Sequence, residues 1–256
     1  MQQVATQAEG TLSPTKQDEV VNWSAQYGIH HVALIPDGNR RWAQEHSMEA
    51  KLGHTVGLLQ VLPRIIDGLC DRGVHTITAW GFSTENWARV RVEVEHLMTI
   101  FAEFLSHQVL ELANRHHARL VHIGRRDRLP DSVLSRIDHA LEATAKYDQH
   151  VFNMAIDYGG EDELARAADR MLEAARQGRA VEGASLRDFL DTAGQPYPNP
   201  DVIIRSSGEH RLSGFLPLQS SYSELFFVKE QFPEFNMELL DSVGRAFNER
   251  KRRFGT

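Results

Sequence analysis

The sequence predicts an α/β fold: a single domain built on a mostly parallel central sheet of about six strands, flanked by helices. Two observations carry this prediction. Short apolar segments alternate with helical patterns along the chain, which is typical of βα units. The apolar segments are rich in β-branched and aromatic residues, as expected of strands that are buried on both faces of a parallel sheet.

Six segments have the composition of such strands. They are HHVALIP (30–36), HTITAWGF (75–82), ARLVHIG (118–124), HVFNMAID (150–157), DVIIRS (201–206) and SELFFV (223–228). Each is too short for a typical helix and carries the residue types that favour strands.

Helical patterns fill the intervals between these strands. Residues 92–116 predict one long helix, with apolar side chains at helical spacing from Leu97 to Leu112. Residues 131–147 and 161–178 predict two more amphipathic helices, the second ended by Gly178. The single cysteine, Cys70, lies in an apolar, helix-like context, and we interpret it as part of the core.

The bulk properties indicate one ordinary globular domain. The chain has 256 residues, of which 41% are hydrophobic and 25% charged, and these suffice for one large core. Residues 1–25 are polar and aperiodic, so we expect an N-terminal tail or a loosely docked helix there, with the domain itself spanning residues 26–256. The net charge of −7 disfavours a nucleic-acid partner.

The chain lacks a recognisable secretory signal, and no apolar run approaches the roughly 20 residues that a transmembrane segment requires. We therefore expect a soluble, cytoplasmic protein.

Polar residues gather after the predicted strands. The first strand ends in PDGNRRWA, the second in FSTENWAR, the fourth in DYGG and the fifth in RSSGEHRLSG. Because ligands of open α/β sheets bind beyond the carboxyl ends of the strands, these four segments predict one shared site.

The residue types in these segments favour a phosphate-bearing substrate. Guanidinium groups bind phosphate oxygens through paired donors, and five arginines are placed to converge at the site: Arg40, Arg41, Arg89, Arg205 and Arg211. Gly38 and Gly208 allow close backbone approach to an anion, and a helix that begins after Asn39 would direct its positive end there. Asp37 and Glu224 are carboxylates among these arginines, which fits a Mg²⁺ ion that bridges to phosphate.

Common phosphate and catalytic motifs do not account for the pattern. The chain has neither a G-x-x-x-x-G-K-[ST] loop nor a G-x-G-x-x-G fingerprint, and it lacks a nucleophile elbow. A P-loop enzyme, a dinucleotide-binding fold and an α/β-hydrolase are therefore not supported.

The ordered motifs do resemble a known family. DGNRRWA (37–43), GHTVG (53–57), FSTENWAR (82–89), DYGG (157–160), RSSGEHRLSGF (205–215) and YSELFF (222–227) follow one another as in the cis-prenyltransferases, the undecaprenyl diphosphate synthase-like isoprenyl transferases. The resemblance runs from about His30 to the terminal ERKRRFG. It implies a Mg²⁺-dependent, homodimeric enzyme that condenses an allylic diphosphate (dimethylallyl, geranyl or farnesyl) with isopentenyl diphosphate and releases diphosphate.

The resemblance also implies roles for individual residues. Asp37 would hold Mg²⁺ and help the allylic diphosphate to ionise, and Asn86 is a candidate proton acceptor. The allylic diphosphate pocket would comprise Gly38, Asn39, Arg40, Arg41, Trp42, His54 and Arg89. Ser83, Thr84, Glu85 and Trp87 would form, with Asn86, the loop between the two substrates. Arg205, Arg211, Leu212 and Ser213 would hold the second diphosphate, while His210 and Glu224 would complete the metal site, with Glu224 near the dimer interface.

The chain departs from the family pattern at several positions. Ala50 replaces an arginine that contacts the allylic diphosphate, a loss for which Arg40 or Lys51 would have to compensate. FLPLQ, with Pro217 and Leu218, replaces FLLWQ, and Glu161 and Val90 replace a usual arginine and proline. These changes around an intact diphosphate-binding core predict a short-chain or specialised product.

Two alternatives to regular elongation follow from the same resemblance. One is irregular head-to-middle condensation of two dimethylallyl diphosphates, as in lavandulyl-type enzymes. The other, from a different functional class, is a non-catalytic partner subunit of a cis-prenyltransferase. Such subunits generally lack the aspartate motif, whereas this chain keeps Asp37.

Overall fold

The computed structural model describes residues 20–250, and these form the predicted α/β domain around one parallel sheet. Its strands are β1 (His31–Ile35), β2 (Thr76–Ser83), β3 (Ala118–Ile123), β4 (His150–Tyr158), β5 (Val202–Arg205) and β6 (Glu224–Phe227). Each coincides with one of the six predicted segments, and every neighbouring pair is parallel, in the order β3-β4-β2-β1-β5-β6. The predicted fold class is confirmed.

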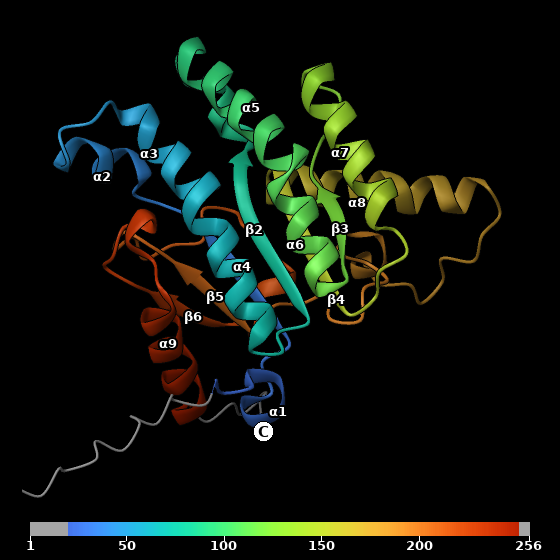
Figure 1. Cartoon of the computed structure of the whole chain (residues 1–256). Coiled ribbons are helices and arrows are strands. Elements are labelled where there is room, and N and C mark those ends of the chain that lie inside the picture. The colour runs from blue at the N-terminus through green and yellow to red at the C-terminus, as the bar shows by residue number, and fades with distance from the viewer. Residues whose placement is uncertain (1–19, 251–256) are drawn as a thin grey trace, which may run out of the picture.

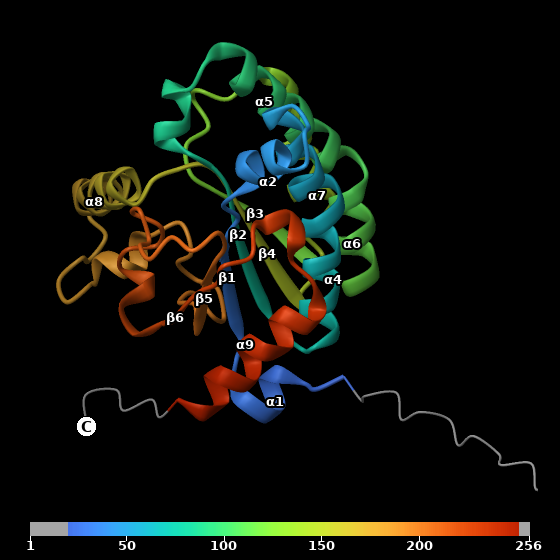
Figure 2. The same ribbon diagram turned by 90° about the vertical axis from the view of Figure 1, so that its left-hand side faces the viewer.

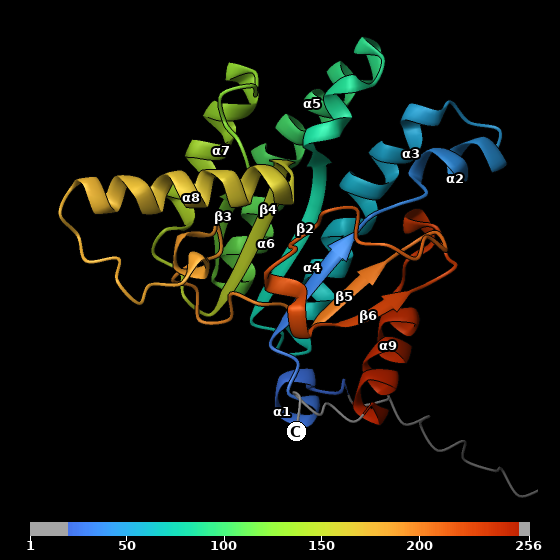
Figure 3. The ribbon, with the colours of Figure 1, turned by 180° about the vertical axis from the view of Figure 1, so that it is seen from behind.

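Helices cover both faces of the sheet. Their bounds are α1 (Trp23–Tyr27), α2 (Asn39–Glu45), α3 (Ala50–Val56), α4 (Leu62–Asp71), α5 (Arg91–Ser106), α6 (Gln108–His116), α7 (Asp131–Thr144), α8 (Gly160–Arg176) and α9 (Met237–Glu249). Figure 1 shows α4, α5, α6 and α7 in front of the sheet. Figure 2 shows the sheet between this layer and α8, and Figure 3 shows α8 crossing the opposite face.

The main core lies between the sheet and the layer of α4 to α7. It contains the apolar side chains of β2 and β4 together with those of the surrounding helices, and the buried Cys70 belongs to it, as predicted. A smaller apolar cluster on the other face packs Trp80 and Tyr158 against Phe215. Because both faces are covered, the strands read as continuous apolar runs.

The single helix predicted for residues 92–116 is divided into α5 and α6. At His107 the backbone leaves the helical region, with φ of −134° and ψ of −60°. Next to this break, Gln108 donates a hydrogen bond from Nε2 to the Leu59 carbonyl at 3.0 Å. The apolar spacing continues across the break, so periodicity alone did not reveal it.

The predicted N-terminal tail, residues 1–25, lies mostly outside the described residues. Of its described part, Trp23 begins α1 and is buried, with 1% of its surface exposed. Its backbone N–H donates to the Arg72 carbonyl at 2.7 Å, which attaches α1 to the end of α4. None of the helices within residues 20–250 has the length and apolar character that crossing a bilayer requires.

Candidate active site

The site lies where the connections of the sheet change direction. From β1 the chain moves to β2, and from β5 it moves to β6 on the other side, so β1 and β5 are neighbours at a topological switch point. Ligands of open α/β sheets bind at such a point. Arg205 at the end of β5 donates from Nη2 to Oδ2 of Asp37, just past β1, at 2.9 Å. Sheet topology thus brings the two predicted residues together.

The turn after β1 is fixed by the neighbouring loop. Ser206 Oγ donates to the Asp37 carbonyl at 2.7 Å and accepts from the Asp37 N–H at the same distance. Gly38 has φ of +89°, and a Cβ there would lie 2.5 Å from Ser207 Oγ. A larger residue would therefore be strained and would also push the loop away. The Phe232 N–H, which the sequence did not indicate, holds the Asp37 carbonyl as well, at 3.0 Å.

The glycines of GHTVG allow α3 to pack closely on α2. A Cβ on Gly53 would lie 1.8 Å from the Asn39 carbonyl oxygen, and one on Gly57 would lie 2.3 Å from Asn39 Oδ1. Only glycine permits this separation, which sets the position of the first turn of α2. Asn39 also donates from Nδ2 to the Pro36 carbonyl at 3.4 Å.

Four of the five predicted arginines divide between two acidic partners in and beside the site. Arg205 and Arg41 contact Asp37, the latter at 3.4 Å. Arg40 and Arg89 instead contact Glu93 in α5, at 3.3 and 2.8 Å. Glu93 was not predicted, although its position four residues after Arg89 is the spacing at which opposite charges pair on a helix.

His54 lies between Glu93 and the cavity. Its Nε2 is 3.7 Å from Glu93 Oε1 and has no hydrogen-bond partner within the described part of the chain. Burial, reinforced by the nearby Arg89 charge, lowers the pKa of the imidazole to about 4. His54 is therefore neutral near pH 7 and keeps one ring nitrogen available for a ligand.

Ser83 ends β2, and Asn86 and Trp87 lie in the one-turn helix that follows it. Asn86 Oδ1 accepts from the Ser83 N–H at 3.1 Å, closing the one-turn helix Thr84–Ala88 on itself. Thr84 donates to Glu85 at 2.7 Å, outside the cavity lining. Trp87 Nε1 donates to Oδ1 of the buried Asp157 at 2.9 Å. Asp157 is the acid of the DYGG motif, and the sequence alone suggested no role for it.

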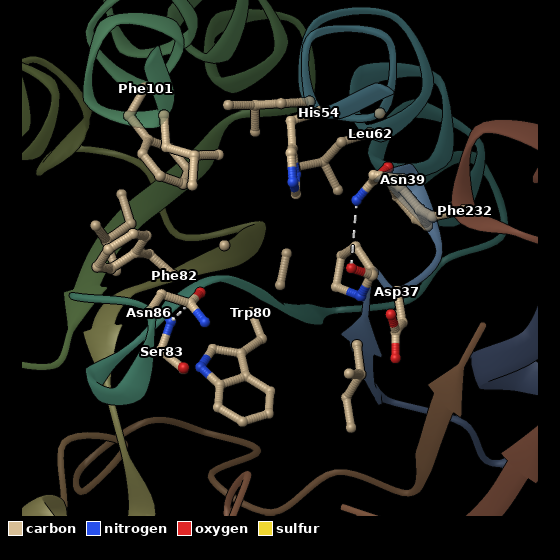
Figure 4. A pocket seen from close by; sticks show the side chains of 18 of the residues that line it. Asp37, Asn39, His54, Leu62, Trp80, Phe82, Ser83, Asn86, Phe101 and Phe232 are labelled. Atoms are coloured by element: carbon tan, nitrogen blue, oxygen red, sulfur yellow. Dashed lines mark hydrogen bonds between the residues drawn. The ribbon is translucent and has the colours of Figure 1, made fainter. Parts of the chain in front are cut away.

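A cavity of about 240 Å³ connects these elements. Figure 4 shows Asp37 on one side of it and Ser83 and Asn86 on the other, with His54 and Trp80 between them. Eight predicted site residues line it: Asp37, Asn39, His54, Ser83, Asn86, Arg89, Arg205 and Ser213. The inner wall is apolar and includes Phe82, Leu97, Ile100, Phe101, Phe104 and Phe152. Four of these residues, Leu97, Ile100, Phe101 and Phe104, come from α5.

The loop after β5 holds the guanidinium of Arg205 in place. Arg205 donates from Nη1 to the Arg211 carbonyl at 2.6 Å and to Ser213 Oγ at 2.9 Å. Arg205 is 5% exposed, and both terminal nitrogens of its guanidinium are hydrogen-bonded. Its position is therefore set before any ligand binds. The Arg211 side chain points instead to Glu209 at the surface, and Leu212 packs with the smaller apolar cluster.

The other predicted residues lie outside the cavity lining: Gly38, Arg40, Arg41, Trp42, Thr84, Glu85, Trp87, His210, Arg211, Leu212 and Glu224. Gly38 is covered by Ser207, Trp42 stacks on His46 with ring centroids 4.4 Å apart, and His210 stacks on Phe227 at 5.1 Å. Glu224 begins β6 and is paired in register with Val202, whereas Arg205 is paired with Phe227. Three residues of strand separate these levels by about 10 Å, and Glu224 contacts Arg250 at 2.7 Å. Within one chain, Glu224 is not brought to Asp37.

The single carboxylate that lines the cavity fits a Mg²⁺ ion that is also bound by the substrate. Residues 20–250 contain no group of three or more His, Cys, Asp or Glu side chains with metal-binding geometry. Asp37 alone faces the cavity with about a third of its side chain exposed. Mg²⁺ commonly binds through one or two carboxylates together with substrate phosphates and water, so one carboxylate is enough when a diphosphate supplies further oxygens.

The departures from the family pattern have clear structural places. Ala50 begins α3, and the adjacent Lys51 pairs with the exposed Glu49 at 2.8 Å on the surface. Pro217 packs on Gly160, where a Cβ would lie 2.5 Å from its ring. Glu161 lies in the first turn of α8, where a carboxylate is favourable.

The chain matches known proteins over most of its length. Residues 35–255 match the family model described as "Putative undecaprenyl diphosphate synthase". The isoprenyl transferase of Thermotoga maritima is 37% identical over 227 residues, 88% of this chain and 96% of that protein. Dehydrodolichyl diphosphate synthase 1 of Arabidopsis thaliana is 35% identical over 230 residues, 88% of this chain and 75% of that protein.

Two solved structures share the fold. Lavandulyl diphosphate synthase from Lavandula x intermedia, in complex with dimethylallyl diphosphate, has a TM-score of 0.84 and 31% identity, covering 89% of this chain and 98% of that one. A probable undecaprenyl diphosphate synthase from Campylobacter jejuni has a TM-score of 0.69 and 28% identity, covering 89% and 99%. The family match, the relatives and the arginine-lined switch point agree: this chain belongs to the undecaprenyl diphosphate synthase family and is a cis-prenyltransferase enzyme.

Proposed function

We propose that this enzyme condenses an allylic diphosphate with isopentenyl diphosphate in a Mg²⁺-dependent reaction and releases a short-chain cis-prenyl diphosphate. The observation that carries the proposal is the shape of the cavity. Its polar end is formed by Asp37 and Arg205, and its apolar end is walled by phenylalanines of β2, α5 and β4. A charged head group and a short hydrocarbon tail suit these two ends.

The cationic residues would bind and neutralise the diphosphates. Arg205 is preorganised by the Arg211 carbonyl and Ser213, so it binds an anion with little loss of side-chain freedom. Arg40 and Arg89 are held by Glu93 and would turn to the allylic diphosphate as it enters. We propose that Asp37 holds Mg²⁺, which when bound supplies positive charge to the departing diphosphate.

In the reaction, the bond between C1 of the allylic substrate and its diphosphate oxygen breaks. C4 of isopentenyl diphosphate forms the new bond to C1, and a proton leaves C2. The amide oxygen of Asn86 already accepts one hydrogen bond from Ser83, and its second lone pair is the proposed acceptor facing that proton. The apolar wall keeps water from the allylic cation.

The inner wall supports a short product. Gly81 leaves space beside β2, but a Cβ there would lie 2.9 Å from Cε1 of Phe101. The ring of Phe101 therefore fills the space that the glycine leaves, and Phe82 packs against the same ring with centroids 6.4 Å apart. A chain growing inward from Asp37 meets these rings.

One observation favours a second candidate, the irregular coupling of two dimethylallyl diphosphates. The lavandulyl diphosphate synthase resembles this chain with a TM-score of 0.84. In that reaction the second substrate would also be an allylic diphosphate, and the same arginines would serve both head groups.

Product analysis tests the proposal and separates the two candidates. Purified protein is incubated with Mg²⁺ and dimethylallyl diphosphate alone, then with isopentenyl diphosphate added, then with geranyl or farnesyl diphosphate as the primer. We expect short products that require isopentenyl diphosphate and disappear when Mg²⁺ is chelated. Product from dimethylallyl diphosphate alone would favour irregular coupling, and long polyprenyl chains would contradict the short-chain assignment.

We further propose that the enzyme acts as a homodimer, as its family resemblance implies. Light scattering of the protein during the same assays tests this. Turnover by a homodimer of the purified chain would also show that no separate catalytic subunit is required.

A further inference from the structure

An ion pair behind the cavity fixes the loop that carries Asn86. We propose that Asp157 and Arg128 are positioning residues for Asn86, acting through the indole of Trp87. The inference rests on the proposed function, because Asn86 is the proton acceptor in it. Neither Asp157 nor Arg128 lines the cavity, so an effect on turnover would pass through the loop of Asn86, where Trp87 donates a hydrogen bond to Asp157.

Asp157 is held tightly at the end of β4. Its side chain is fully buried, and its φ of +56° is uncommon for a residue with a side chain. Its carbonyl accepts from the Arg125 N–H at 2.9 Å, so the loop after β3 holds its backbone. Strained backbone of this kind persists only where the surrounding contacts enforce it.

Three polar contacts converge on the Asp157 carboxylate. Arg128 donates from Nε to Oδ2 at 3.0 Å and from Nη2 to Oδ1, and Trp87 Nε1 donates to Oδ1 at 2.9 Å. A buried carboxylate needs both charge and hydrogen-bond partners. Arg128 supplies the charge. Trp87 supplies a hydrogen-bond donor, and this bond joins the Asp157 carboxylate to the loop of Asn86.

Trp87 links Asp157 to the loop that carries Asn86. It directly follows Asn86 in the one-turn helix Thr84–Ala88. Arg128 lies over its ring, 5.8 Å from the centroid, and Phe82 packs edge-on at 5.1 Å. The indole is held on these sides, so we infer that it also restricts the position of the adjacent Asn86 across the cavity from Asp37.

The test compares Arg128→Met with Arg126→Met. Arg126 lies in the same loop and pairs with exposed Asp138 instead, so it matches the loss of charge without touching Asp157. We expect Arg128→Met to lower kcat about tenfold with KM for dimethylallyl diphosphate within about twofold of wild type, the signature of a lost transition-state interaction. Arg126→Met should change neither value.

Trp87→Phe keeps a ring against Phe82 and removes only the donor. Its kcat should fall about as far, and combining it with Arg128→Met should lower kcat no further, because the two changes break one linkage. Equal kcat for Arg128→Met and Arg126→Met, or single effects that multiply in the double variant, would overturn the proposal.

A further variant guards against simple unfolding. Asp157→Asn combined with Arg128→Met leaves an amide oxygen for Trp87 and buries no unpaired charge, so it should restore thermal stability and most of kcat. A stable double variant with kcat still tenfold low would count against the role of Trp87.

One measurement is independent of turnover. The Nε1–H of Trp87, assigned by its loss in Trp87→Phe, should exchange slowly in wild type and Arg126→Met and rapidly in Arg128→Met. Equal exchange in all three would refute the positioning contact. Wild-type protein without product would refute the proposed function instead and leave this exchange test standing.

Discussion

Replacing Asp37 with alanine separates the chemistry of the site from its stability. The change removes the ion pair with Arg205 at 2.9 Å and the longer one with Arg41 at 3.4 Å. Arg205 keeps its hydrogen bonds to the Arg211 carbonyl and Ser213 Oγ. Arg41, about half exposed, keeps its contact with Glu209. Neither guanidinium is left without a partner.

The structure therefore limits the cost in stability. Asp37 is about a third exposed, so solvent screens its ion pairs, and we expect the free energy of unfolding to fall by about 1–2 kcal/mol. For a domain of this size that lowers the unfolding temperature by about 2–8 °C. Because Asp37 is proposed to hold the Mg²⁺ that stabilises the departing diphosphate, its loss should instead lower kcat at least about a thousandfold.

Asp241→Ala provides a matched control. Asp241 is also 32% exposed and pairs at 2.7 Å with Arg72, whose side chain is 8% exposed, but it lies on α9, away from the cavity. We expect a similar loss of stability and unchanged turnover. Product formation by mass analysis and thermal unfolding are measured on the same preparations. Near-normal turnover by Asp37→Ala, or an equal loss in Asp241→Ala, would refute the reasoning.

Three further predictions follow from other contacts. Gly53→Ala places a Cβ 1.8 Å from the Asn39 carbonyl, so we expect a loss of about 2–3 kcal/mol in urea unfolding together with weaker substrate binding; wild-type values for both would contradict the packing role. Phe101→Ala should lengthen the product and Gly81→Ala, 2.9 Å from that ring, should shorten it, as read by mass analysis; unchanged product lengths would show that the wall is elsewhere. His54 has a pKa of about 4 in the folded chain and 6.5 in the unfolded chain. The free energy of unfolding therefore falls as the pH drops from 6.5 to 4, by about 3 kcal/mol at most. In urea unfolding, the free energy of His54→Gln should fall less over this pH range, and an equal fall would contradict the pKa assigned to His54.

Much of the fold and part of the site followed from local sequence patterns. All six strands could be predicted because strands buried on both faces are short, continuous apolar runs. Asp37, Arg89 and Arg205 could be predicted because polar side chains after parallel strands share one edge of the sheet, whereas His54 on α3 followed only from the family resemblance. The break at His107 could not, because apolar spacing continues through it.

The contacts that no local pattern predicts join residues distant in the sequence. Asp157 and Arg128 are 29 residues apart, and Trp87 is 70 from Asp157. Glu224 looked like a neighbour of the arginines because its motif belongs with theirs in order along the chain. Strand register instead places Glu224 at the amino end of β6, three residues before Phe227, the residue level with Arg205. The sequence predicts the strands and helices, but the register between strands determines which residues lie near the ligand.

The pairing of Asp37 with Arg205 also determines when during folding a substrate site first exists. These two residues are 168 positions apart, and β5 can join β1 only after the intervening strands and helices have been made. Contacts of such sequence separation slow folding, and a nascent or proteolysed chain that ends before β5 holds Asp37 without its partner cation. If Asp37 and Arg205 bind a diphosphate as proposed, the complete site would form only after β5 has joined the sheet, and bound substrate would selectively stabilise completed molecules over truncated ones.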